Sequence, residues 1–126
     1  MAPQQLNIKV ATYRVTVARD TRWLVMTAPS TAGPLWQVEF VYMSPLPPWR
    51  GNLLPSKQAT AFLPLGAFGD GYHLLQTEDP VFAYIWYETT DNSVFDGFLT
   101  TSDEPAGEGF ADPRATPWPW LKPIGP

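Results

Sequence analysis

Apolar and polar residues alternate along most of the first hundred positions, a pattern typical of β-strands. The clearest case is residues 35–43, where every second side chain from Trp36 to Tyr42 is apolar and Glu39 falls in the opposite phase. One face of such a segment packs on a core while the other meets solvent. We therefore predict a half-buried strand here.

Residues 6–17 also alternate, but the phase slips by one between Val10 and Tyr13. A slip of one residue turns every later side chain to the other face of a strand. We predict either a β-bulge at Ala11 and Thr12 or two strands that share a corner, and both suit a curved sheet.

Further strands are predicted over residues 22–28, 60–63, 72–76, 81–89 and 93–101. The last two form a hairpin, and the first of that pair is apolar in both phases until Glu88, which predicts a central strand covered on both sides. Asp70 and Gly71 form a tight-turn signal before residues 72–76. No stretch shows convincing helical periodicity. The expected fold is an all-β single-domain sandwich or barrel of about six to seven mostly antiparallel strands.

The domain is predicted to span residues 1–101, followed at residues 102–126 by an acidic glycine- and proline-containing loop and an extended tail. Proline fixes φ and lacks an N–H, so this tail suits neither a helix nor a central strand. Its two tryptophans would anchor it on its own domain or on a neighbour. The expected partner contacts are Pro117, Trp118, Pro119, Trp120 and Leu121, together with Trp49 and Arg50 of a proline-rich loop at residues 45–50.

Composition excludes several classes of function. The chain of 126 residues has a formal net charge of -4, six tryptophans and no cysteine. The acidic balance without a clustered basic face argues against a nucleic-acid backbone as partner, and the lack of cysteine removes disulfides and thiolate chemistry. We find neither a membrane span nor a signal peptide in the chain as given, and expect a soluble protein of undetermined compartment.

Candidate catalytic and metal-binding residues are sparse. The single histidine, His73, would need Ser44, Ser56 or Ser93 nearby to form a triad, and none of these serines lies in a nucleophile-elbow pattern. No cofactor is expected. A weak calcium candidate consists of four carboxylates in a glycine-containing stretch, Asp103, Glu104, Glu108 and Asp112, whose spacing does not match an EF-hand.

Aromatic strands supply two further possibilities. Glu39 and Glu88 each lie near tryptophan and could form the acid and base of a small glycosidase. A non-catalytic sugar or small-ligand site could use the same carboxylates beside a platform of Trp36, Tyr84, Trp86 and Tyr87.

Taken together, the sequence favours a non-catalytic structural or protein-interaction subunit of a larger assembly, which contacts a protein partner or a second copy through its tail and loop. A carbohydrate or small-molecule binding module is the first alternative. A small hydrolase is the second.

Overall fold

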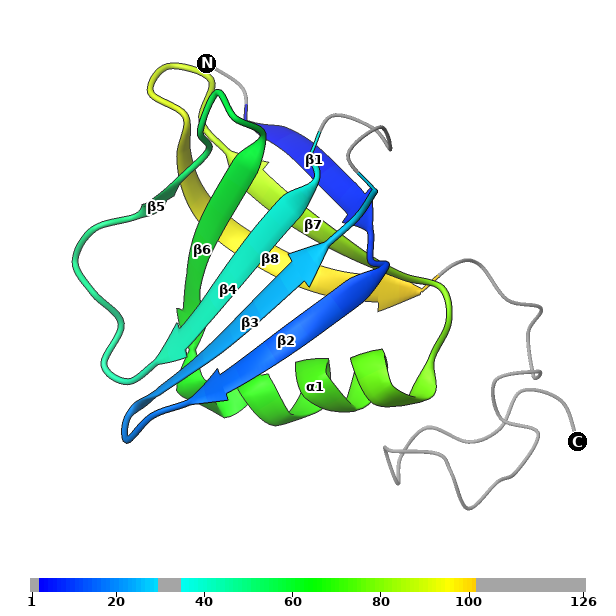
Figure 1. Ribbon diagram of the computed structural model, residues 1–126. Coiled ribbons are helices and arrows are strands. Elements are labelled where there is room, and N and C mark those ends of the chain that lie inside the picture. Colours follow the sequence, from blue (N-terminus) through cyan, green and yellow to red (C-terminus); the bar gives the residue numbers. More distant parts are fainter. Residues whose placement is uncertain (1–2, 30–34, 102–126) are drawn as a thin grey trace, which may run out of the picture.

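The protein is a sandwich of two four-stranded sheets, shown by a computed structural model that describes residues 3–29 and 35–101 (Figure 1). Sheet A has the strand order β1-β7-β8-β5, and sheet B has the order β2-β3-β4-β6. The elements are β1 (Gln4–Lys9), β2 (Thr12–Val17), β3 (Thr21–Thr27), β4 (Gln37–Met43), β5 (Gly51–Asn52), β6 (Gln58–Pro64), the 3₁₀ helix η1 (Leu65–Ala67), α1 (Phe68–Thr77), β7 (Val81–Tyr87) and β8 (Ser93–Thr101).

The all-β sandwich is confirmed, although the described residues form eight strands rather than six or seven. Pairing is antiparallel except between β4 and β6, which run parallel. Strand β7 occupies the predicted central position, between β1 and β8, but the second sheet of the described residues covers only one of its faces, which corrects the expectation of cover on both sides. The predicted tail lies outside the described residues.

The phase slip at residues 11–12 is the point where the chain passes from one sheet to the other. The N–H of Val10 donates to the carbonyl of Val81 in sheet A, at 2.9 Å, and the N–H of Ala11 donates to the carbonyl of Thr27 in sheet B, at 2.7 Å. Consecutive residues therefore bond to different sheets. The shared corner that the slip predicted is confirmed.

A second corner joins the sheets at the turn between β5 and β6. The N–H of Lys57 donates to the carbonyl of Leu54 at 2.9 Å, and Lys57 has a left-handed φ of 68°. Leu53 and Ala59 form an isolated antiparallel bridge next to this turn. The two sheets are thus connected along both sides of the sandwich.

The core fills the space between the sheets, and it follows the alternation of the strands. Phe40 in β4 is fully buried and has an edge-to-face contact with Tyr42, with ring centroids 6.1 Å apart. The other large side chains that are fully buried are Ile8, Leu24, Met26, Leu35, Ile85, Val38 and Val94. No charged or polar residue of the described part is buried.

Helix α1 corrects the prediction that the chain contains no helix, and with it the strand expected at residues 72–76 and the turn expected at Asp70 and Gly71. Phe68, Tyr72 and Leu75 follow helical spacing, but the glycines between them masked that pattern. Tertiary packing outweighs the low helix propensity of glycine.

The helix packs on the sandwich through aromatic contacts. The ring centroid of Phe68 lies 5.4 Å from that of Tyr42 and 5.5 Å from that of Tyr72. Leu75 of the same helix is buried. A Cβ at Gly71 would lie 3.0 Å from the Tyr42 hydroxyl. Glycine at this position therefore permits the close approach of helix and sheet.

Burial raises the pKa of the Tyr42 hydroxyl above the usual tyrosine value of 10.0. The folded protein consequently retains this proton at pH values where the unfolded chain has lost it. The free energy of unfolding should not depend on Tyr42 below about pH 10, and above it should fall by up to about 1.4 kcal/mol per pH unit.

Tyr42→Phe removes this titration, so its stability should fall less steeply with alkaline pH than that of the wild type. Urea unfolding at about pH 9 and at higher pH measures the difference. Equal pH slopes for the two proteins would contradict the assignment.

Candidate functional site

The solvent side of sheet A carries an unusual concentration of aromatic side chains. Along β7, Val81, Ala83 and Ile85 face the core, so the intervening aromatic residues face outward, where they are half-buried. Strand register adds Phe98 of β8, which is 37% exposed. We call this surface the outer aromatic face; it consists of Phe82, Tyr84, Trp86 and Phe98.

Polar residues of the neighbouring strands frame the outer aromatic face. Tyr84 pairs with Asn7 on one side and Phe98 on the other, and Trp86 pairs with Gln5 and Asp96 in the same way. The row of Phe82 ends in Lys9 and Thr100. An apolar centre with a polar rim is the composition of a protein-contact surface.

Two of these rings stack on each other. The centroids of Tyr84 and Phe98 lie 5.0 Å apart, and their planes differ by 5°. Each ring therefore covers one face of the other. That leaves fewer free ring faces for a sugar, which stacks on an exposed ring face.

The proline-rich loop adjoins this surface at the end of the β7–β8 hairpin. The Arg50 guanidinium lies 5.3 Å from the centroid of Phe95, a distance typical of a cation–π contact. Arg50 Nη1 is 3.7 Å from a carboxylate oxygen of Glu88 and donates to the Ser93 hydroxyl at 3.5 Å. Its neighbour Trp49 is 64% exposed. The arginine thus holds the loop against sheet A while the tryptophan remains open to solvent.

The hairpin loop beside Arg50 is locally ordered. The Asp91 carboxylate accepts the Ser93 N–H at 2.9 Å, and Asn92 adopts a left-handed φ of 59° that asparagine tolerates. This hydrogen bond, together with the charge of Arg50, holds the pKa of Asp91 below its usual value. The loop end of the surface is therefore preorganised.

Of the four aromatic residues proposed as a sugar platform, the structure places two together. Tyr84 and Trp86 belong to the outer aromatic face, whereas Tyr87 packs against the core cluster. Trp36 precedes β4 in sheet B, where its Nε1 donates to the carbonyl of Ser56 at 2.9 Å.

The two candidate carboxylates lie on different sheets. Glu39 is in β4, opposite in phase to the buried Val38 and Phe40, and so points outward from sheet B. Glu88 follows β7 of sheet A and pairs with Arg50. An acid and base on outer surfaces of opposite sheets do not flank one bond of a substrate.

The remaining candidates are His73, the calcium-binding carboxylates and the tail contacts. His73 lies in α1, and its carbonyl accepts the Thr77 hydroxyl at 2.9 Å. Within residues 3–29 and 35–101, no three His, Cys, Asp or Glu residues are grouped so that they could hold a metal. The calcium candidates (Asp103, Glu104, Glu108, Asp112) and the tail contacts (Pro117, Trp118, Pro119, Trp120, Leu121) lie outside the described residues.

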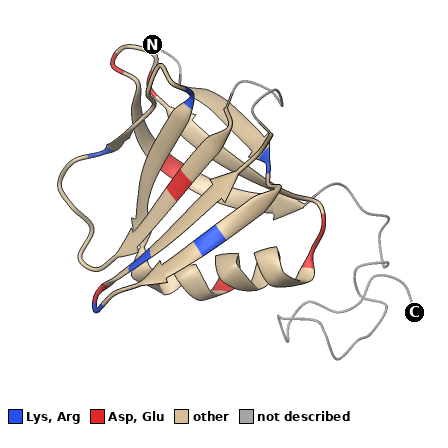
Figure 2. Ribbon diagram, in the orientation of Figure 1, with Lys and Arg blue, Asp and Glu red and all other residues tan. Residues whose placement is uncertain are grey.

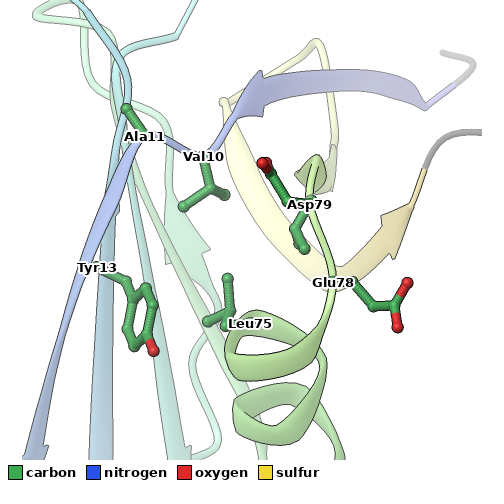
Figure 3. Close-up of a pocket in the computed structure, with 7 residues that line it drawn as sticks. Val10, Ala11, Tyr13, Leu75, Glu78 and Asp79 are labelled. Atoms are coloured by element: carbon green, nitrogen blue, oxygen red, sulfur yellow. The ribbon is translucent and has the colours of Figure 1, made fainter.

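A hollow of about 300 Å³ lies between the sheet corner and the end of α1 (Figure 3). Leu75 and Tyr13 face it from the helix and from β2, and Glu78 and Asp79 border it. Its lining contains no histidine, lysine or arginine.

The predicted platform left out Phe82, Phe95 and Phe98, although Phe82 alternates in phase with Tyr84 and Trp86. The signal was present in the hairpin: once its loop is located, antiparallel register places Phe98 beside Tyr84. The bulge in β8 next to Trp86 and Tyr87, which alters the phase at Phe95, had no comparable signal.

Charged residues are widely spaced over both sheets (Figure 2). Among the described residues, no helix has the combined length and hydropathy that crossing a membrane requires. Comparison with protein-family models, with curated proteins and with solved structures finds no match for this chain.

Proposed function

We propose that this protein is a non-catalytic protein-interaction domain, and that the outer aromatic face with the adjoining Trp49–Arg50 loop is its contact surface. The observation that carries the proposal is the continuous row of aromatic side chains on the solvent side of a sheet whose opposite side already forms the core. Contiguous apolar surface with a polar rim is characteristic of binding sites.

Residue types at this surface support a protein partner. Tryptophan, tyrosine and arginine are the residues that contribute most to binding energy in protein interfaces. Trp86, Tyr84 and Arg50 all lie in or beside the surface, and Trp49 extends it into solvent. The Tyr84–Phe98 stack favours a protein over a sugar, because it covers ring faces.

The tail is a second contact element in this proposal. Residues 117–121 combine two tryptophans with two prolines, and proline reduces the entropy lost when a segment docks. Together, face, loop and tail would serve a subunit of a larger assembly. The carbohydrate module remains the second candidate, on the strength of Tyr84 and Trp86 alone.

Affinity capture tests the contact surface: the full chain or a variant is immobilised, and the proteins that it binds from an extract of cells that naturally make it are recovered. Phe98→Ala and Trp49→Ala should each reduce recovery of bound protein at least tenfold, because both side chains are exposed and neither is part of the core. The matched control is Phe62→Ala, which removes an outward-facing ring from β6 of sheet B. It should leave recovery unchanged.

Recovery of bound protein at the wild-type level with Phe98→Ala and with Trp49→Ala, as with the Phe62→Ala control, would refute the proposed surface. Quenching of tryptophan fluorescence by a sugar, abolished by Trp86→Phe, would favour the carbohydrate alternative instead.

A further inference from the structure

We infer that the outer aromatic face is a docking surface for a proline–tryptophan segment, and that its occupant in the free protein is residues 116–124 of the same chain. The inference rests on the proposed function of that face and names the chemistry of its partner. Aromatic-lined surfaces recognise extended polyproline segments because such segments lose little entropy on binding.

The chain leaves the sandwich beside this face. Strand β8 ends at Thr101, which pairs with Val81. The preceding residue, Thr100, pairs with Phe82 and belongs to the first row of the face. The segment that follows therefore begins at the margin of the aromatic surface.

The sequence of the segment fits a polyproline helix with two apolar faces. That helix has three residues per turn, so positions three apart share a face. One face would carry Pro117, Trp120 and Pro123. The next would carry Trp118, Leu121 and Ile124, and the third Thr116, Pro119 and Lys122.

The dimensions of segment and surface agree. From residue 117 to residue 123, a polyproline helix spans about 19 Å at its characteristic rise. The face extends about 13 Å along β7, from Phe82 to Trp86, at the rise of a strand, and about 10 Å across three strands. Two turns of the segment thus cover the aromatic rows.

The connecting chain favours the segment's own domain over a second copy. In this proposal residues 102–115 connect the segment to β8 over 14 residues, which include two glycines, two prolines and five charged residues. A flexible chain of 14 residues would have a root-mean-square span of about 20 Å, and prolines and charges lengthen it, so the connection reaches along the face. Its effective concentration at the face is then in the millimolar range, above ordinary protein concentrations.

Sheet B is a poorer site for the segment. Its outward-facing aromatic residues, Trp23 and Phe62, lie on either side of Val41, but the adjacent row contains Arg14 and Glu39. Strand β8, from which the segment continues, belongs to sheet A. The outer surface of sheet B therefore serves as the control.

The test uses the full chain labelled with 5-fluorotryptophan, which gives one ¹⁹F signal for each of its six tryptophans. Signals are assigned with single Trp→Phe variants, and the shift between H₂O and D₂O reports the exposure of each indole. In the wild type, the signals of Trp118 and Trp120 should show less than half the isotope shift of free fluorotryptophan.

Variants on the two sheets then locate the docking surface. Phe98→Ala should bring the isotope shifts of Trp118 and Trp120 close to the free value, whereas Phe62→Ala should leave them unchanged. In the reciprocal experiment, Trp120→Ala should move the Trp86 signal and leave that of Trp23 in place. Unchanged signals of Trp23 and Trp36 report that each variant remains folded.

Several results would overturn the inference. The first is a full isotope shift of both tail tryptophans in the wild type. The second is a change in the Trp118 and Trp120 signals on Phe62→Ala but not on Phe98→Ala. The third is a change in these signals on Tyr13→Ala alone, which would place the two tryptophans in the hollow beside α1. Light scattering that shows a tail-dependent dimer would replace the same-chain occupant with a second copy. None of these results affects capture of a partner by the face, so the two proposals fail separately.

Discussion

Gly51→Ala is expected to destabilise the protein by about 3 kcal/mol or more, at the upper end of the range for overpacked sites. A Cβ at Gly51 would lie 1.8 Å from the carbonyl oxygen of Thr60. The contact is with backbone, so no side-chain rotation relieves it, and β5 would have to separate from β6. Urea unfolding measures the loss as a lower midpoint at constant slope.

The matched control is Gly66→Ala in η1, where an added Cβ would meet no atom within 4 Å. It should change the free energy of unfolding by about 0.5 kcal/mol or less. Similar stabilities for the two variants would show that β5 does not pack on β6 as described.

The Gly51→Ala substitution should also disturb the proposed contact surface. Strand β5 pairs with β8 through only two residues, Gly51 and Asn52, and Arg50 immediately precedes it. Displacement of β5 would draw Arg50 away from Glu88 and Phe95. Gly51 therefore supports the loop side of the proposed surface as well as the fold.

Phe40→Ala is expected to cost about 3–5 kcal/mol, the range for removing a fully buried phenylalanine. Its ring is 0% exposed and fills the space opposite Gly97, where an added Cβ would approach Phe40 Cε1 to 2.7 Å. The ring thus packs between the two sheets at a position where sheet A has no side chain. Denaturant unfolding provides the measurement, with Val17→Ala, at a site 62% exposed, as a control expected to change little.

A double-mutant cycle tests the specific contact. Gly97→Ala should be destabilising alone because of the clash with the ring. Combined with Phe40→Leu, it should cost less than the sum of the two single changes, because leucine vacates the space that the new methyl group enters. Strict additivity would contradict the packing of Phe40 over Gly97.

The strands could be predicted because their burial follows local alternation. Val38, Phe40 and Tyr42 share one phase and are buried, and the hairpin of β7 and β8 forms where the β-branched and aromatic runs predicted it. The slip between Val10 and Tyr13 predicted even the corner between the sheets. In these segments local pattern and tertiary packing agree.

Helix α1 could not be predicted in the same way, because its stability arises from contacts distant in sequence. Two of its ten residues are glycine, and its contacts with the sandwich depend on Tyr42 in β4. Local propensity disfavours a helix at this position. The packing that reverses this preference is visible only in the assembled fold.

The candidate site was predicted in part for a related reason. Tyr84 and Trp86 could be recognised as sharing one face of their strand, and the same alternation puts Tyr87 on the opposite, core face. The position of Trp36, before β4 of the other sheet, could not be derived from a single strand. The row formed by Asn7, Tyr84 and Phe98 depends on pairing between three strands. Sequence predicts faces of single strands more readily than surfaces built by a sheet.

The most direct test of the central claim is hydroxyl-radical footprinting of the full chain, free and in complexes recovered from the producing cells. The account predicts that partner binding lowers the oxidation of Phe95 and Trp49, at the loop side of the contact surface, while that of Trp23 on sheet B stays the same. Protection of Trp23, with sheet A oxidised as readily as in the free protein, would contradict it.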